Sequence, residues 1–289
     1  MWNHLMRFVG HTKMYKFDAI NVDSAGKLTL ATTGEVIQEY PIYDPARTEI
    51  LSDKEVFFKS RMSWLGPARR NGEALIVVDS INPLAEPRRA WIYLPGQRRV
   101  KLAPEVGYDT PNPGTGGMAT YDDGQAFNGA LDRYDFKLVG KQETILPYNA
   151  YKLVYSPKDA KDVTLAKHVN SDLIRWELRR VWVVEATLKP GKRHIYAKRT
   201  FYLDEDSWTI LASDQYDARD QLFRSTLAFM APAYEVPVPA ADTLVIHDFM
   251  AGSYSYYTGF VGKYVGLKFI DPLPSRQWSP DSLSGAGIR

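Results

Sequence analysis

The segment FYLDEDSWTILASDQYDARDQL, residues 201–222, groups carboxylates closely enough to bind a metal ion or to carry out acid–base chemistry. They are Asp204, Glu205, Asp206, Asp214, Asp217 and Asp220. Their spacing does not fit the calcium-loop pattern D-x-[DN]-x-[DN]-G. Short acidic side chains also cap backbone groups at turns, and the apolar residues between them alternate as in β-strands. We therefore predict that most of these carboxylates lie at the corners of an antiparallel meander.

Strand pairing around these corners predicts an apolar face that continues from strand to strand. Symmetric turns at LKPGKR, DEDS and DARD give three opposed pairs: Trp182 with Arg199, Arg199 with Ala212, and Asp214 with Phe223. Arg199 and Asp214 then interrupt the apolar face, and a buried arginine needs a partner. We predict an ion pair between them with Trp182 stacked on the guanidinium. This pair would either tie strands together or orient the headgroup of a ligand.

The same alternation recurs along most of the chain, in short aromatic runs separated by Pro, Gly, Asn and Asp. It predicts strands near residues 11–20, 27–32, 36–43, 55–64, 74–81, 88–94, 97–103, 133–143, 148–155, 176–188, 194–203, 208–216 and 221–231. Helical signals are confined to 120–129 and 159–168. These patterns predict a mainly β protein: a strongly curved antiparallel sheet, like an incomplete barrel, with a few short helices covering its concave face.

Something must cover the apolar face of so wide a sheet. Either the sheet curls around a cavity, or another element fills the space. The side chains that we expect to line such a ligand cavity are Phe58, Met62, Trp91, Tyr93, Phe136, Trp182, Arg199, Phe201, Trp208 and Asp214. The Pro- and Gly-rich stretch 103–118 is a candidate lid or binding loop. We predict a single domain over residues 1–270 and a C-terminal tail, 271–289, that lies on the surface or is disordered.

Composition excludes several classes of function. The chain has no cysteine, and its five histidines are scattered without the spacing of metal ligands. A balance of 36 basic against 34 acidic residues argues against a nucleic-acid surface. The arginine doublets do not change this conclusion, because neighbouring residues of a strand point to opposite faces. We predict no cofactor, metal site or catalytic residue.

Several longer runs carry a family resemblance: RAWIYLPGQRRVKLAP at 89–104, DRYDFKLVGKQE at 132–143 and, most specific, the stretch 175–217. The chain resembles a bacterial family of unknown function related to the outer-membrane lipoprotein-sorting proteins LolA and LolB. The resemblance implies a periplasmic or outer-membrane-associated protein with an apolar cavity for acyl chains. It also suggests a resistance-nodulation-division exporter as a partner, and a chain that lacks the family's N-terminal part.

From these observations we expect a non-enzymatic carrier or binding protein for a lipid or another hydrophobic ligand. The alternative is an interaction or adaptor module of an envelope transport complex, with a solid core and an exposed edge or loop that docks on a partner. A hydrolase is disfavoured, because no paired acid and base survive the assignment of the carboxylates to turns.

Overall fold

The computed structural model describes residues 1–104, 106–258 and 266–284. Its strands form a 14-stranded sheet in the order β6-β5-β4-β3-β2-β1-β13-β12-β11-β10-β9-β8-β7, with β14 paired to β1 beside this path. The bounds are β1 Thr12–Val22, β2 Leu28–Glu39, β3 Val56–Gly66, β4 Ala74–Ser80, β5 Arg89–Leu94, β6 Arg99–Leu102, β7 Tyr134–Pro147, β8 Trp176–Leu188, β9 Lys198–Asp204, β10 Ile210–Tyr216, β11 Leu222–Ala228, β12 Leu244–Asp248, β13 Ser253–Thr258 and β14 Lys268–Phe269.

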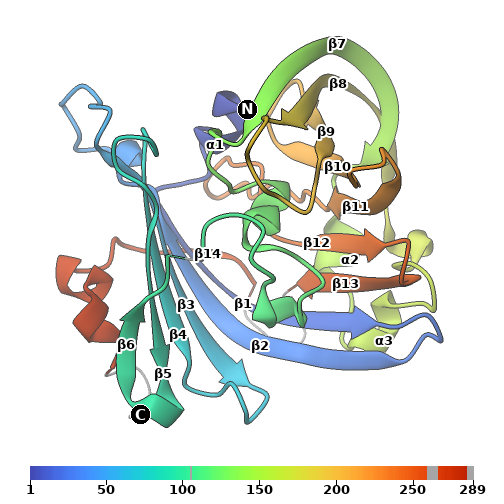
Figure 1. The fold of residues 1–289 in the computed structure, drawn as a ribbon. Coiled ribbons are helices and arrows are strands. Elements are labelled where there is room, and N and C mark those ends of the chain that lie inside the picture. The colour runs from blue at the N-terminus through green and yellow to red at the C-terminus, as the bar shows by residue number, and fades with distance from the viewer. Residues whose placement is uncertain (105, 259–265, 285–289) are drawn as a thin grey trace.

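The sheet curves so that its two ends face each other across a hollow (Figure 1). Strands β1 to β6 form one limb of the sheet. Strands β7 to β13 form the other limb, and β7 and β8 arch over it (Figure 1). Every strand pairing is antiparallel, and β6 and β7 remain as the two ends of the sheet. The predicted fold, a mainly β protein with one strongly curved antiparallel sheet and few short helices, is confirmed.

The helices are short and lie on both faces of the sheet. They are α1 Trp2–Leu5, α2 Tyr151–Tyr155, α3 Ala160–Val163, η1 Pro41–Tyr43, η2 Pro95–Gln97, η3 Pro113–Thr115, η4 Tyr121–Ala126, η5 Ser171–Leu173, η6 Ser275–Trp278 and η7 Pro280–Leu283. Helices η3 and η4 lie in the hollow, whereas α2 and α3 pack on the outer face of β1, β12 and β13 (Figure 1). Alternation along β12 shows this division, since Val245 packs with α2 and α3 while Leu244 and Ile246 point into the hollow.

Several element predictions need correction. The separate strands predicted at 27–32 and 36–43 are one strand, β2, and the segment predicted as a strand at 148–155 contains helix α2 instead. Strand β7 runs on to Pro147, where proline ends it. Strands β12, β13 and β14 lie beyond the last predicted strand. The tail was predicted to lie on the surface or to be disordered; its described residues, 271–284, form η6 and η7, which pack on the outer face of β4 and β5 and bury Trp278 and Leu283.

The register of the meander also differs from the prediction. Trp182 lies opposite Leu203 and Ala186 opposite Arg199, a shift of an even number of residues that keeps the expected face inward. Between β9 and β10 an irregularity near Ile210 sets Arg199 opposite Gln215 and not Ala212. This odd shift reverses which residues of β10 share a face with Arg199.

Candidate functional site

The segment between β6 and β7 occupies much of the hollow. Its Pro- and Gly-rich part, predicted as a lid or binding loop, packs against the inner face of β1 and β2 (Figure 1). The Thr32 hydroxyl donates to the Gly114 carbonyl over 2.7 Å, and Asn21 Nδ2 donates to the Thr115 carbonyl over 2.9 Å. Buried backbone carbonyls require such donors. The concave face is thus covered partly by the chain itself, with cavities left between.

Helix η4 follows within the same segment, where the sequence TYDDG predicted a helix. A capping box starts it: the Thr120 amide donates to Asp123 Oδ2 over 2.8 Å, while the Thr120 side chain caps the N3 backbone. Both Asp122 and Asp123 are buried, each only 1% exposed. Carboxylates at this depth must be paired, so the helix requires a cation from the sheet.

Arg199 on β9 supplies that cation. It is fully buried, and it donates from Nη1 to Asp122 Oδ2 over 2.9 Å and from Nη2 to Asp123 Oδ1 over 3.0 Å. His194 Nε2 lies 3.0 Å from the same Asp122 oxygen. Burial opposes ionisation of Asp122, but Arg199 and His194 outweigh it and hold the pKa of this carboxyl below its usual value. The network fixes the segment inside the hollow to β9.

The predicted ion pair between Arg199 and Asp214 is therefore wrong. Asp214 accepts hydrogen bonds from the Tyr202 hydroxyl over 3.1 Å and from Ser225 Oγ over 3.0 Å. The odd shift of register between β9 and β10 explains the difference, because it turns Asp214 to the opposite face. The stacking of Trp182 on Arg199 is also wrong. The rings around the guanidinium are those of Phe127, Tyr196 and Phe201.

Most carboxylates of the 201–222 segment do lie at corners, as predicted. Asp204 accepts from the Ser207 amide and hydroxyl, and Asp217 accepts from the amides of Arg219 and Gln221. Others form ion pairs along the rim, among them Glu205 with Lys141. Among the described residues no group of three or more histidines and carboxylates could hold a metal ion. The segment thus stabilises turns.

An open apolar cleft of about 350 Å³ lies on the inner side of β7, β8 and β9. Phe136 and Leu138 of β7, Val184 of β8 and Leu203 of β9 form its floor and sides. It is completed by Trp182, Trp208, Met1 and Asn3. We call this space the outer cleft.

The outer cleft has an aromatic wall. The rings of Trp182 and Trp208 stack with centroids 6.2 Å apart and planes 5° from parallel. Trp208 adopts a left-handed backbone conformation at its corner, with φ of 58°, which carries its ring back over β8. Helix α1 lies beside the cleft and is anchored by His4, whose ring nitrogens lie 3.2 Å from the carbonyl oxygens of Phe127 and Trp208. Burial lowers the pKa of His4, so this ring is neutral.

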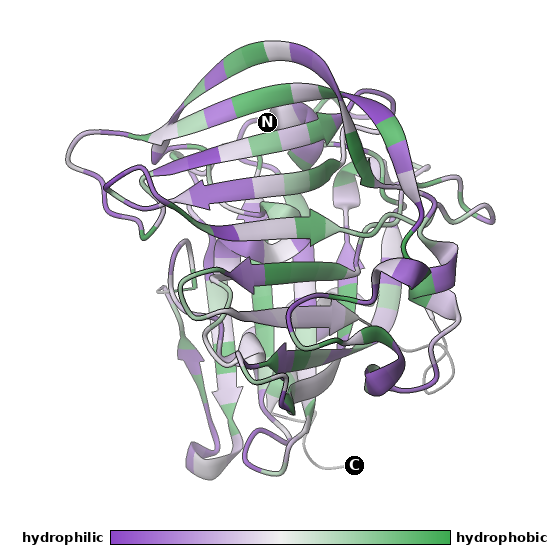
Figure 2. Ribbon diagram, turned by 90° about the vertical axis from the view of Figure 1, so that its right-hand side faces the viewer, coloured by the Kyte–Doolittle hydropathy of each residue, from purple (hydrophilic) through white to green (hydrophobic). Residues whose placement is uncertain are grey.

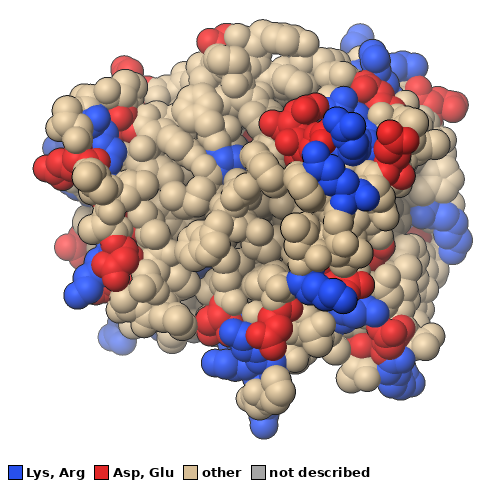
Figure 3. Space-filling view, turned by 90° about the horizontal axis from the view of Figure 1, so that it is seen from above, with Lys and Arg blue, Asp and Glu red and all other residues tan. Residues whose placement is uncertain are grey.

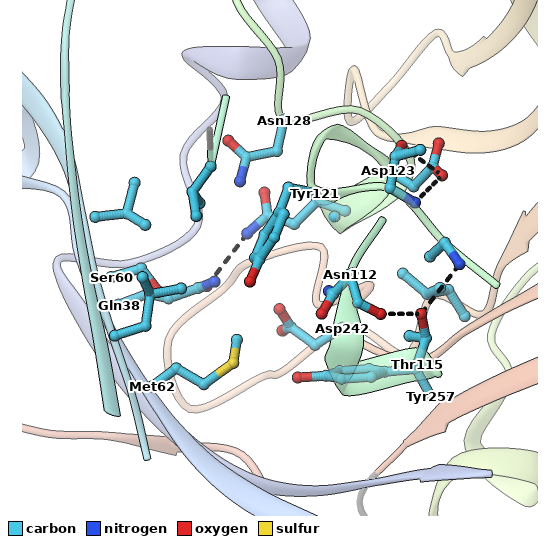
Figure 4. A pocket seen from close by; sticks show the side chains of 18 of the residues that line it. Gln38, Ser60, Met62, Asn112, Thr115, Tyr121, Asp123, Asn128, Asp242 and Tyr257 are labelled. Atoms are coloured by element: carbon cyan, nitrogen blue, oxygen red, sulfur yellow. Dashed lines mark hydrogen bonds between the residues drawn. The ribbon is translucent and has the colours of Figure 1, made fainter. Parts of the chain in front are cut away.

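A second, smaller cavity of about 110 Å³ lies deeper, between the limb of β1 to β4, strands β12 and β13, and the segment with η3 and η4. Phe58 and Met62 line it from β3. Figure 4 shows Gln38, Ser60 and Met62 on one side and Asn112, Thr115 and Tyr257 on the other, with Tyr121 and Asp242 between them. We call this space the inner pocket.

The structure divides the residues expected around a single cavity. Phe136, Trp182 and Trp208 lie in the outer cleft, and Phe58 and Met62 lie in the inner pocket. Arg199 and Phe201 are buried under η4, and Asp214 lies on the other face. Trp91 and Tyr93 also point to the outer face, where Trp278 and Leu283 of the tail cover them.

Sequence reasoning missed the polar residues of the inner pocket. Tyr15 of β1, Gln38 of β2 and Asp242 meet there, although more than two hundred positions separate Tyr15 from Asp242. Local alternation carries no information on such a contact. Alternation could, however, have predicted a strand at LVIHD, residues 244–248, and thus Leu244 and Ile246 on one face of it.

Figure 3 shows the molecule from above with respect to Figure 1, and the surface on this side is hollowed at its centre. Charged side chains of both signs stand in separate groups around its margin, and most of the middle is uncharged (Figure 3). Apolar and polar residues are interspersed along β7 and β8 (Figure 2). None of the helices in the described part of the chain is long and apolar enough to cross a membrane.

Comparisons with known proteins agree with this architecture. The family model DUF1329, described as a protein of unknown function, matches residues 1–284. The uncharacterized protein PA3922 of Pseudomonas aeruginosa is 39% identical over 304 residues, and this chain spans all of its own length but 63% of that protein.

Solved structures show the same fold at low sequence identity. A domain from Vibrio parahaemolyticus assigned to the outer membrane lipoprotein-sorting proteins aligns with a TM-score of 0.64 at 15% identity, over 98% of this chain and 96% of that one. A DUF1329 family protein from Desulfovibrio piger gives 0.59 at 14% identity, over 95% and 92%. A LolA superfamily protein from Nitrosomonas europaea gives 0.51 at 12%, over 96% and 94%. The expected bacterial family of unknown function and the expected LolA-like fold are confirmed.

Proposed function

The chain belongs to the DUF1329 family, and from its LolA-like fold and its outer cleft we propose that it is a carrier that binds a hydrophobic or lipidated ligand. The proposed role is not enzymatic. It would be exercised in the periplasm or at the outer membrane, in keeping with the lipoprotein-sorting assignment of the Vibrio parahaemolyticus domain.

The observation that carries this proposal is the outer cleft. Its volume of about 350 Å³ falls in the range of small-molecule pockets. Its walls are apolar and aromatic, and its two tryptophans are only partly buried although they stack on each other. Covering about ten methylene groups there would contribute roughly 8 kcal/mol before the cost of association. Area burial alone could therefore hold an alkyl chain.

The alternative, an interaction module, is favoured by one observation. Strand β7 is an end of the sheet, and Leu138, Val139 and Ile145 on it are more than half exposed. An exposed sheet edge can accept an extended segment of a partner. The 103–118 stretch, however, packs inside the hollow and offers less surface for docking. None of these observations bears on an exporter, and the proposal does not require one.

A matched pair of variants tests the carrier. Leu138 lies in the outer cleft and is 59% exposed, while Leu178 on β8 is 66% exposed and does not line it. The probe is the neutral dye N-phenyl-naphthylamine, which fluoresces in apolar sites. We expect Leu138→Glu to weaken its binding at least about tenfold, a change of 1.4 kcal/mol, and Leu178→Glu to leave it unchanged. No binding by the parent protein, or equal binding by both variants, would refute the proposal.

A further inference from the structure

The inner pocket has walls of mixed chemistry. Apolar side chains from both limbs line it, including Phe58, Met62, Leu75 and Ile246. Hydroxyl and amide groups enter it between them. The hydroxyl groups of Tyr15 and Tyr257 are hydrogen-bonded to each other, and Ser255 Oγ is buried without a partner among the described residues. Apolar walls with a few convergent polar groups are the usual composition of a ligand site.

The charged residues that line this pocket are Arg88, Asp123 and Asp242. Each is already paired within the protein. Asp242 receives Lys13 Nζ at 2.7 and 2.9 Å, on a lysine whose side chain is 4% exposed. Arg88 forms a two-point pair with Asp79, both contacts being 2.7 Å.

Asp123 shares the cation of Arg199 with Asp122 and is also held by hydrogen bonds. Its carboxylate accepts from Arg199 Nη2 at 3.0 Å and from the Tyr196 hydroxyl and the Thr120 amide at 2.8 Å. Every charged residue among the described lining residues is therefore already engaged in an ion pair, and none is free to act as the counterion of a charged ligand. A ligand ion would lose its hydration and gain no counterion, which costs several kcal/mol. A neutral group that hydrogen-bonds loses little.

From this charge compensation we infer that the inner pocket is a second binding site, and that it accepts a small uncharged group with hydrogen-bonding capacity, such as an alcohol, an ester or an amide on a short apolar body. Carboxylates, phosphates and ammonium groups are excluded. A cavity of about 110 Å³ suits a group of a few heavy atoms, since an engineered cavity of about 150 Å³ binds benzene. The inference goes beyond the proposed function, because it names the charge state that the interior accepts and does not depend on the outer cleft.

The hydrogen-bonding partners of such a group are neutral at physiological pH. Burial, followed by the neighbouring Tyr257 and Asp242, raises the pKa of Tyr15 well above its ordinary value. Its hydroxyl therefore keeps its proton. Ser60 and Gln38 add further polar groups on the opposite wall (Figure 4).

Three small molecules of one shape test the inference at neutral pH: butanol, butyrate and butylammonium. Binding is followed by protein-observed NMR titration of the full chain. We expect butanol to bind the parent protein at least about tenfold more tightly than either ion, a difference of 1.4 kcal/mol or more. Equal binding of the three, tighter binding of an ion, or no binding of any would overturn the inference.

Variants that remove one charge of the Lys13–Asp242 pair test whether charge compensation causes the preference for an uncharged ligand. Asp242→Ala leaves Lys13 without its counterion and opens space beside it, so butyrate should become the preferred ligand. Lys13→Met leaves Asp242 exposed to the pocket, so butylammonium should become preferred. The double variant Lys13→Met/Asp242→Ala has no uncompensated charge and should prefer butanol again.

The melting temperature provides a second readout of this test, which is useful if the single variants are less stable than the parent protein. The ion that replaces the lost partner should raise the melting temperature of its own variant, because a ligand that binds only the folded state stabilises it. Butyrate should thus stabilise Asp242→Ala and not Lys13→Met, and butylammonium should do the reverse. Variants that keep the butanol preference, or that respond alike to both ions, would contradict the assignment. A failure of the dye to bind the outer cleft would leave this result standing.

Discussion

Removing the charge of Arg199 should destabilise the protein strongly. Arg199 is fully buried and pairs with two carboxylates, Asp122 and Asp123, that are themselves 1% exposed. Arg199→Leu leaves both carboxylates in the interior without a cation. Breaking a buried pair in this way costs roughly 3–5 kcal/mol. Since a whole domain is stable by about 5–15 kcal/mol, the variant should lose a large part of its stability.

The assay is urea unfolding followed by tryptophan fluorescence, with the free energy taken from the midpoint and slope. The triple variant Arg199→Leu/Asp122→Asn/Asp123→Asn should recover part of the loss, because neutral amides need no counterion. Arg219→Leu is the control: Arg219 is 77% exposed in its pair with Asp217, and such pairs contribute about 0–1 kcal/mol. If the free energy of unfolding of Arg199→Leu lies within about 1 kcal/mol of that of the parent protein, the reasoning on the buried network is wrong.

The network of Asp122, Arg199 and His194 should also make the stability of the protein depend on pH in the acidic range. The pKa of Asp122 is lower in the folded protein than its ordinary value, because Arg199 and His194 outweigh the effect of burial. Its contribution is therefore fully present above the unfolded pKa and is lost as the pH falls through the folded pKa. Arg199→Leu should flatten this part of the stability profile, measured as the unfolding midpoint in urea against pH.

Three further substitutions test other parts of the fold. Burial, followed by His168, lowers the pKa of His247 to about 4, so stability should fall by roughly 3 kcal/mol between pH 6.5 and 4, and His247→Phe should remove that dependence in thermal melts. Trp278→Ala should cost about 3–5 kcal/mol in urea unfolding, because its buried ring packs on β4 and β5; an unchanged free energy of unfolding would contradict this packing. Gly34→Ala should cost about 1–3 kcal/mol, because its Cβ would lie 2.6 Å from the Ser63 carbonyl oxygen; an unchanged melting temperature would contradict this close approach.

The sequence predicted those parts of the fold that depend on local pattern. Alternation over 176–188 matches β8 residue for residue, and the acidic corners DEDS and DARD are turns as expected. The face of β8 that was predicted to be apolar does point inward, because the observed register between β8 and β9 differs from the predicted register by an even number of residues. Such features need only the period of the strand and the composition of the turn.

Features that depend on a single inserted residue or on distant contacts could not be predicted. The irregularity near Ile210 is one inserted residue, yet it moves Asp214 away from Arg199. The partners of Arg199 come instead from a helix more than seventy residues earlier in the chain. Trp91 and Tyr93 were placed on an apolar face, but alternation does not say which face is concave. The tail decides this, because Trp278 covers them from outside.

The way in which the hollow is filled explains why the outer cleft and the inner pocket differ in chemistry. A chain segment laid inside a sheet brings backbone carbonyls that must be satisfied, so the facing strands need polar side chains. Thr32 and Asn21 meet this need for η3, and Arg199 and Arg88 contact the carbonyls of Ala126 and Asn128 near η4. The inner pocket borders this segment and therefore inherits polar, charge-compensated walls. The outer cleft lies beyond it, where side chains of β7 to β9 and the two tryptophans form most of the wall, and it remains apolar. The described part of the segment between β6 and β7 thus separates a cleft with mostly apolar walls from a pocket with polar, charge-compensated walls.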